Sequence, residues 1–150
     1  MAMPGTTTTN VDTELAARMR LAVGRLARQL RRRSSAGLTL SQLSALASVE
    51  LLEPVRLGDL AACEGVAAPS MTRIAAAMVE AGLVERRGAP DDARSSLLRT
   101  TPAGRRALRA VRRERTELLV TRLEALPPEV REALPDAVRL LEALVEGDEG

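Results

Sequence analysis

A short stretch in the middle of the chain, LGDLAACEGVAAPSMTRI (Leu57–Ile74), places the tightest constraint on the fold. Leu60 and Ala61 supply one apolar side to a short helix over about 57–64, and Gly65 then supplies a turn. Pro69 follows in the first turn of a second helix over about 68–81, where its missing N–H costs no hydrogen bond. Two helices joined by a glycine-containing turn form a helix-turn-helix. We therefore expect a mostly α-helical fold built around this motif.

The second helix of this motif divides into an apolar and a polar side. We expect its apolar residues to be buried: Met71, Ile74, Ala75 and Met78. Ser70, Thr72 and Arg73 then lie on the exposed N-terminal turn. In DNA-binding helix-turn-helices this turn reads base edges in the major groove, and its free amides suit a phosphate. We interpret Pro69, Ser70, Thr72 and Arg73 as DNA contacts, and a solvated helix face is the alternative.

A β-hairpin is predicted directly after the second helix. Two short apolar runs, 83–84 and 97–98, flank a tip rich in glycine, proline and aspartate. Such a hairpin beside a recognition helix forms a wing, here over about 86–99. We expect its polar residues to contact DNA, and Asp92 to brace the nearby Arg94 by an ion pair; the contact residues are Arg86, Arg87, Arg94 and Ser95.

Helices are also predicted on both sides of the winged region. A first helix is expected to begin at Asn10 or Asp12 and to end at SSAG (34–37). A second begins at Thr39 or Ser41 and stops before residues 53–54, because a residue ahead of proline avoids the helical region.

Thr101 and Pro102 are the cap and first position of a long helix that runs to about residue 125. A last helix follows, and Pro135 is expected to kink or split it.

These elements predict a division into regions. Residues 1–10 form a disordered tail, 37–101 a winged helix-turn-helix, and 147–150 an acidic tail. Residues 11–36 and 102–146 form a helical dimerisation region. Their apolar stripes would leave much apolar surface exposed in a monomer, which favours a homodimer.

The composition narrows the classes of function. The 150 residues include no His, Phe, Tyr or Trp and one Cys, and all 22 basic residues are arginine. No ring can stack on an exposed base, and no imidazole can act as a base or metal ligand. We expect no metal, no cofactor and no enzyme activity. No apolar run is long enough for a membrane span, and the start lacks a secretion signal, so the expected location is cytoplasmic.

Charge is polarised along the chain. Ten arginines and three acids lie between Arg86 and Arg115, whereas three arginines and eight acids lie between Arg122 and Gly150. This pattern is typical of a chain in which one region meets a polyanion.

Cys63 raises the question of a redox thiol. A sensor thiol needs a cationic, accessible environment, whereas Asp59 and Glu64 are acidic neighbours. A small, partly buried filler residue is the favoured interpretation, and redox sensing is the minor alternative.

Taken together, these segments resemble the MarR (multiple antibiotic resistance regulator) family of winged-helix transcription factors. The resemblance lies in LTLSQLSAL (38–46), Leu57–Ile74, EAGLVERR (80–87) and DDARSSLLRTTPAG (91–104), and it covers residues 12–146. It implies a homodimer with intertwined N- and C-terminal helices that reads a palindrome in double-stranded DNA. It implies residues 69–73 in the major groove, Arg94 in the minor groove, and repression relieved by a small aromatic, phenolic or anionic ligand.

The sequence departs from the family pattern at three places. Arg56 stands where a Ser or Thr helix cap is common, Ala67 and Ala68 replace Ser and Pro, and Thr100 replaces an apolar residue. The sequence therefore predicts a dimeric, sequence-specific DNA-binding regulator, most simply a repressor. A winged-helix module that binds protein and has lost operator recognition is the alternative.

Overall fold

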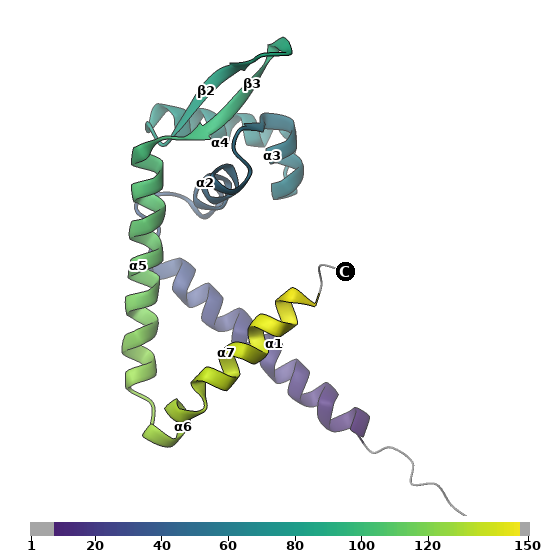
Figure 1. Cartoon of the computed structure of the whole chain (residues 1–150), viewed down its shortest axis with the longest axis vertical. Coiled ribbons are helices and arrows are strands. Elements are labelled where there is room, and N and C mark those ends of the chain that lie inside the picture. Colours follow the sequence, from purple (N-terminus) through teal and green to yellow (C-terminus); the bar gives the residue numbers. More distant parts are fainter. Residues whose placement is uncertain (1–7, 148–150) are drawn as a thin grey trace, which may run out of the picture. The chain divides into compact units, whose positions relative to one another are not determined.

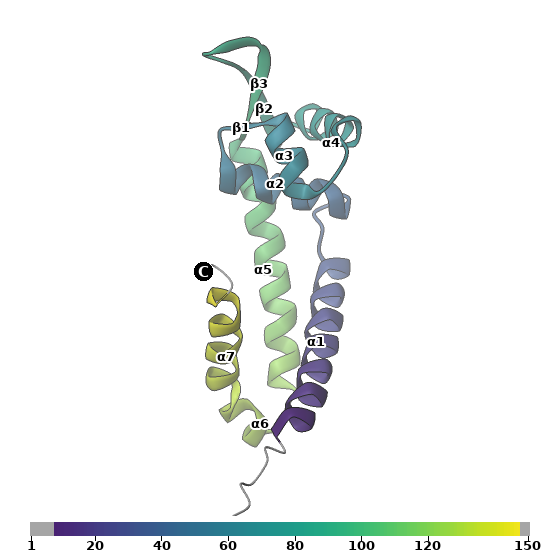
Figure 2. The same cartoon turned by 90° about the vertical axis from the view of Figure 1, so that its right-hand side faces the viewer.

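The computed structural model describes residues 8–147, and the side chains of residues 13–91 and 95–147. Residues 1–7 of the expected tail and 148–150 of the acidic tail lie outside the described residues. The elements follow in the order α1 (Thr8–Arg33), α2 (Leu40–Leu52), β1 (Val55–Arg56), α3 (Leu57–Glu64), α4 (Ala68–Glu80), β2 (Val84–Ala89), β3 (Asp92–Thr100), α5 (Pro102–Glu124), α6 (Pro128–Glu132) and α7 (Leu134–Glu146). Figures 1 and 2 show them in two perpendicular views.

The chain divides into two compact units, one ending at Arg115 and the other starting at Thr116. The first contains α1 to β3 and the beginning of α5, and the second contains the rest of α5 with α6 and α7. Helices α6 and α7 are separated at Ala133, so the expected split near Pro135 is confirmed.

The helix boundaries follow local capping signals. Thr39 caps α2: its Oγ1 accepts a hydrogen bond from the Gln42 N–H, and the Gln42 side chain accepts one from the Thr39 N–H. Gly65 ends α3 with a left-handed φ of 63°, a conformation that glycine adopts without strain. Helix α1 begins at Thr8, earlier than the expected Asn10 or Asp12.

The core of the first unit lies between α2, α3, α4 and the sheet. Its largest fully buried side chains are Leu46, Val49, Leu60, Met71, Met78, Val84 and Leu98. Burial of a side chain of this size stabilises the fold by roughly 1.5–3 kcal/mol relative to exposure. Leu108 and Val111 of α5 belong to the same cluster, so the first turns of α5 are part of the winged-helix core.

The sheet has three antiparallel strands within the described residues, in the order β1-β3-β2. Strand β1 is a correction to the two-stranded hairpin predicted above. It holds two residues, Val55 and Arg56, which pair with Leu98 and Leu97. A two-residue strand is too short to show an alternating apolar pattern, so its existence depends on the partner strand. Beyond it, the β2–β3 hairpin extends away from α2, α3 and α4 (Figures 1 and 2).

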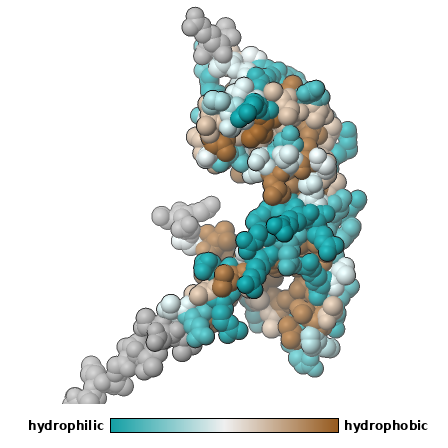
Figure 3. Space-filling model, turned by 180° about the vertical axis from the view of Figure 1, so that it is seen from behind, coloured by the Kyte–Doolittle hydropathy of each residue, from teal (hydrophilic) through white to brown (hydrophobic). Residues whose placement is uncertain are grey.

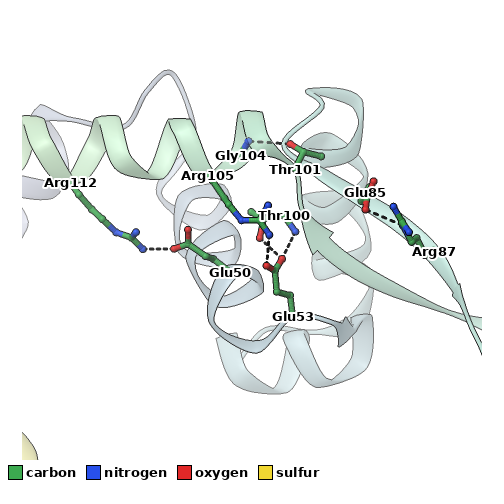
Figure 4. Close-up of polar contacts among 9 residues, drawn as sticks. All are labelled: Glu50, Glu53, Glu85, Arg87, Thr100, Thr101, Gly104, Arg105 and Arg112. Atoms are coloured by element: carbon green, nitrogen blue, oxygen red, sulfur yellow. Dashed lines mark hydrogen bonds and ion pairs between the residues drawn. The ribbon is translucent and has the colours of Figure 1, made fainter.

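Helix α5 starts in close contact with the turn that follows α4. The Thr101 hydroxyl accepts the Gly104 N–H at 3.1 Å and donates to the Gly82 carbonyl at 2.6 Å, which confirms Thr101 as the cap. Figure 4 shows the bond between Thr101 and Gly104. A Cβ atom at Gly104 would lie 2.1 Å from the Leu83 carbonyl oxygen and 3.0 Å from Cγ2 of Thr100. Only glycine fits this position without movement of the backbone.

We therefore expect Gly104→Ala to lower the free energy of unfolding, by about 1–3 kcal/mol, because the methyl group forces two backbone segments apart. Gly58→Ala is the matched control, since a Cβ there meets no atom within 4 Å. That variant should be neutral or more stable by up to about 1 kcal/mol. Urea unfolding followed by circular dichroism measures both, and equal stability of the two variants would contradict the proposed clash.

Candidate nucleic-acid interface

Helix α4 is held by its apolar side. Met71, Ala75 and Met78 are buried, and Ile74 is half-buried against the core, as the sequence predicts. The neighbouring positions on the N-terminal turn therefore face outward: Pro69, Thr72 and Arg73 are exposed and Ser70 is half-buried. The Thr72 hydroxyl donates to the Ala68 carbonyl at 2.9 Å.

The start of α4 lacks a side-chain cap. Its N-cap is Ala67, which makes no side-chain hydrogen bond to the first turn. The amides at a helix start need a partner from outside the helix when no side chain supplies one. Together with the positive end of the helix dipole, this makes the turn suitable for an anionic group such as a phosphate.

The hairpin presents a second row of polar groups. Arg86 and Arg87 are exposed on β2, and Arg87 Nε lies 3.0 Å from Glu85 Oε1 on the same strand (Figure 4). Ser95 on β3 is half-buried. The side chains of Asp92 and Arg94 lie outside the described part of the structure, so the ion pair expected between them stays a prediction.

The tip of the hairpin is a two-residue turn followed by an irregular strand. Residues 90–91 form the turn, since Ala89 pairs with Asp92. The preceding residue, Gly88, pairs with Ser96, so one step along β2 corresponds to four steps along β3. The register between β2 and β3 therefore shifts by three residues beside the turn. A bulge of this kind changes the direction in which a strand presents its side chains.

Arg56 contacts this tip from the start of α3. Its Nη2 lies 2.9 Å from Oδ1 and 2.7 Å from Oδ2 of Asp91, and its Nη1 lies 2.5 Å from Oγ of Ser95. The pKa of Asp91 is below its usual value, first because of a hydrogen bond from its own backbone and then because of Arg56. Sequence reasoning identified Arg56 only as a missing helix cap, because its partners are 35 and 39 residues away.

The base of the wing is tied to α2 and α5 through Glu53. Its Oε2 accepts the Thr100 N–H at 2.6 Å and the Thr100 hydroxyl at 2.5 Å, and its Oε1 accepts Arg105 Nη2 at 2.5 Å (Figure 4). Burial raises the pKa of Glu53, but the hydrogen bonds from Thr100 and then Arg105 outweigh it, so that the pKa is lowered. The burial of the polar Thr100, at a place where the resemblance leads one to expect an apolar residue, is thereby explained: its polar groups are bound by Glu53.

A nearby ion pair reinforces this junction. Glu50, one turn before Glu53 on α2, binds Arg112 of α5 at 2.6 Å (Figure 4).

A cavity of about 390 Å³ lies behind α4. Arg31 of α1, Ser41 and Ser44 of α2, and Glu64 of α3 supply its polar lining, and Met71 and Ile74 of α4 supply apolar atoms. Cys63 on the neighbouring α3 is exposed, which corrects the expected partial burial: Leu60 and Ala61 form the buried side of this helix. Among the side chains that the structure describes, those of residues 13–91 and 95–147, we find no group of three or more Cys, Asp or Glu placed to hold a metal ion. In the same residues, no helix combines the length and apolar character that crossing a membrane requires.

The buried side of α4, its exposed N-terminal turn and the adjoining three-stranded wing define a winged helix-turn-helix protein. A family model described as the MarR family matches residues 38–96. The chain belongs to the MarR family of DNA-binding transcription regulators, because an HTH-type transcriptional regulator of Mycobacterium leprae is 40% identical to it over 136 residues. These residues cover 90% of this chain and 95% of that protein.

Solved structures share the fold over nearly the whole chain. A transcriptional regulator from Pseudomonas aeruginosa has 31% identity and a TM-score of 0.76, and the match covers 91% of this chain and 97% of that one. A MepR variant from Staphylococcus aureus, solved bound to an oligodeoxyribonucleotide, has 17% identity and a TM-score of 0.60 over 93% of this chain and 99% of that one. At that identity the likeness shows the fold alone.

The contacts of Glu53 with Thr100 and Arg105 make the free energy of unfolding depend on pH. Since the pKa of Glu53 is lower in the folded chain, its stabilising effect is complete above the unfolded pKa, about 4.3, and is lost as the pH falls below it. At pH 7 we expect Glu53→Gln to lower the free energy of unfolding by about 1–2 kcal/mol. The difference from wild type should narrow as the pH falls through the Glu53 titration.

Urea unfolding between pH 7 and pH 3 measures this difference. Glu85→Gln is the control, because its ion pair with Arg87 is exposed and contributes less than about 1 kcal/mol. A Glu53→Gln effect that stays constant with pH would show that the carboxylate charge is not what holds the wing base.

Proposed function

We propose that the protein is a homodimeric repressor that recognises a palindrome in double-stranded DNA. In this proposal residues 69–73 of α4 enter the major groove, and Arg73 reads a base. Arg86, Arg87 and Ser95 contact the backbone, and Arg94 enters the minor groove. One observation carries the proposal: the buried apolar side of α4 turns its uncapped, polar N-terminal turn outward, next to an arginine-bearing hairpin.

The homodimer is supported by apolar surface that the chain leaves uncovered. Helix α7 has no buried residue, yet Val138, Leu141 and Leu144 share one side of it. In α1, Leu15, Val23 and Leu26 are exposed as well. Figure 3 shows apolar, brown surface remaining on the helices that flank the winged region. Exposed apolar stripes on this scale are typical of an interface with a second copy.

Response to a ligand is supported by the cavity behind α4. Its volume of about 390 Å³ lies within the range of small-molecule sites, about 300–1,000 Å³. Arg31 gives it a cation, Ser41 and Ser44 give it hydroxyls, and the carboxylate of Glu64 also accepts from Ser48, so that Arg31 is the group for the anionic end of an aromatic or anionic compound. Such a compound would press on Met71 and Ile74 and so displace the recognition helix. Release of DNA by the compound, lost in Arg31→Ala, would locate its site here.

DNA titration tests the base-reading role of Arg73. Promoter DNA and random DNA of equal length are titrated by fluorescence anisotropy at two salt concentrations. We expect Arg73→Ala to weaken binding to promoter DNA by about 1–3 kcal/mol and to relax sequence preference, since the proposed contact to a base edge is lost. Arg94→Ala should weaken binding to both DNAs and reduce the salt slope by about 1.

Arg139→Ala is the matched control, because this exposed α7 arginine pairs with Asp136 of the same helix. It should leave the affinities for promoter DNA and random DNA unchanged.

Saturation at two chains per duplex is expected for the dimer. Equal losses on both DNAs for Arg73→Ala would remove its base-reading role. Weak and equal binding of wild type to both, followed by no enrichment in selection from a random DNA pool, would favour the protein-interaction module instead.

A further inference from the structure

The contacts of Arg56 bracket the irregular part of the wing. Its guanidinium binds Asp91 in the turn before residues 92–94 and Ser95 directly after them. Its backbone is fixed as well, since Arg56 pairs with Leu97 across β1 and β3. One residue thus joins the start of α3 to both ends of the bulged segment.

We propose that Arg56 is a positioning residue for the wing tip, setting the direction in which residues 92–94 meet the DNA. This inference rests on the proposed DNA-binding function and adds to it a residue that acts through Asp91 rather than by touching DNA. The β2–β3 register shifts beside this segment, and at such an irregularity the direction of a strand depends more strongly on contacts from outside the ladder. The planar guanidinium of Arg56 binds both Asp91 oxygens through Nη2 and Ser95 through Nη1, so it holds two partners at a fixed spacing, which the point charge of a lysine would not do.

The ion pair is too exposed for its main effect to be on global stability. Asp91 keeps 70% of its side chain exposed and Arg56 keeps 38%. Pairs of this kind contribute little to the free energy of unfolding. A few-fold change in how often the tip adopts its binding conformation nevertheless changes DNA affinity by the same factor.

The first test needs no DNA. Trypsin cuts after arginine, and Arg94 lies in the bulged segment. We expect Arg56→Ala to speed cleavage after Arg94 about fivefold, the ratio that corresponds to the upper range of an exposed ion pair. Arg112→Ala is the matched control, because it removes a comparable ion pair, to Glu50, away from the tip. Its cleavage rate should equal that of wild type.

The second test separates positioning from direct contact with DNA. Promoter affinity is measured for wild type, Arg56→Ala, Asp91→Asn and the double variant. Arg56→Ala should weaken binding about fivefold in the wild-type background and have little effect in the Asp91→Asn background, because the arginine acts through that carboxylate. Arg56→Lys should recover only part of the loss.

Two outcomes would overturn the inference: an unchanged cleavage rate in Arg56→Ala, or a loss of affinity that persists in the Asp91→Asn background, as for a direct phosphate contact. Both differ from failure of the proposed function, in which wild type itself shows no preference for promoter DNA. Urea midpoints of all variants should lie close to that of wild type, which confirms that each one folds.

Discussion

Burial of Met71, Ala75 and Met78 in the core determines how the whole DNA-facing surface is presented. Because these side chains are buried, α4 can adopt only one orientation about its axis. In this orientation the N-terminal turn with Thr72 and Arg73 faces outward. Rotation of the helix about its axis would expose buried methionines, at a cost of roughly 1.5–3 kcal/mol for each. The direction in which the polar turn faces therefore depends on how the apolar side of α4 packs. A compound in the cavity behind Met71 and Ile74 would act on that packing.

The wing needs separate supports because it extends beyond the core. At its base, Glu53 joins Thr100 of β3 to Arg105 of α5, and Gly104 lets α5 approach the turn after α4. At its tip, Arg56 reaches from the start of α3 to Asp91 and Ser95. Both supports are charged or polar contacts between segments distant in sequence. Their effect is to give a thin hairpin a defined direction relative to the helix-turn-helix.

Local signals in the sequence predicted much of this architecture. Gly65, Pro69 and the apolar spacing located α3 and α4, and Thr101 with Pro102 located the start of α5, since each signal acts within a few residues. Strand β1 was missed because two residues carry no pattern. The supports of the wing were missed for a related reason: Glu53 and Thr100 are 47 residues apart, and Arg56 and Asp91 are 35 apart. Residues at such separations meet only once the chain is folded, so local sequence patterns do not predict their contacts.

In the proposed complex, two copies of this winged helix read symmetric half-sites on one face of the duplex. Hydroxyl-radical footprinting of wild type on promoter DNA tests it most directly. We expect two protected half-sites related by two-fold symmetry, with centres about one helical turn, or 10 bp, apart. A single protected half-site, or uniform weak protection along the duplex, would contradict it.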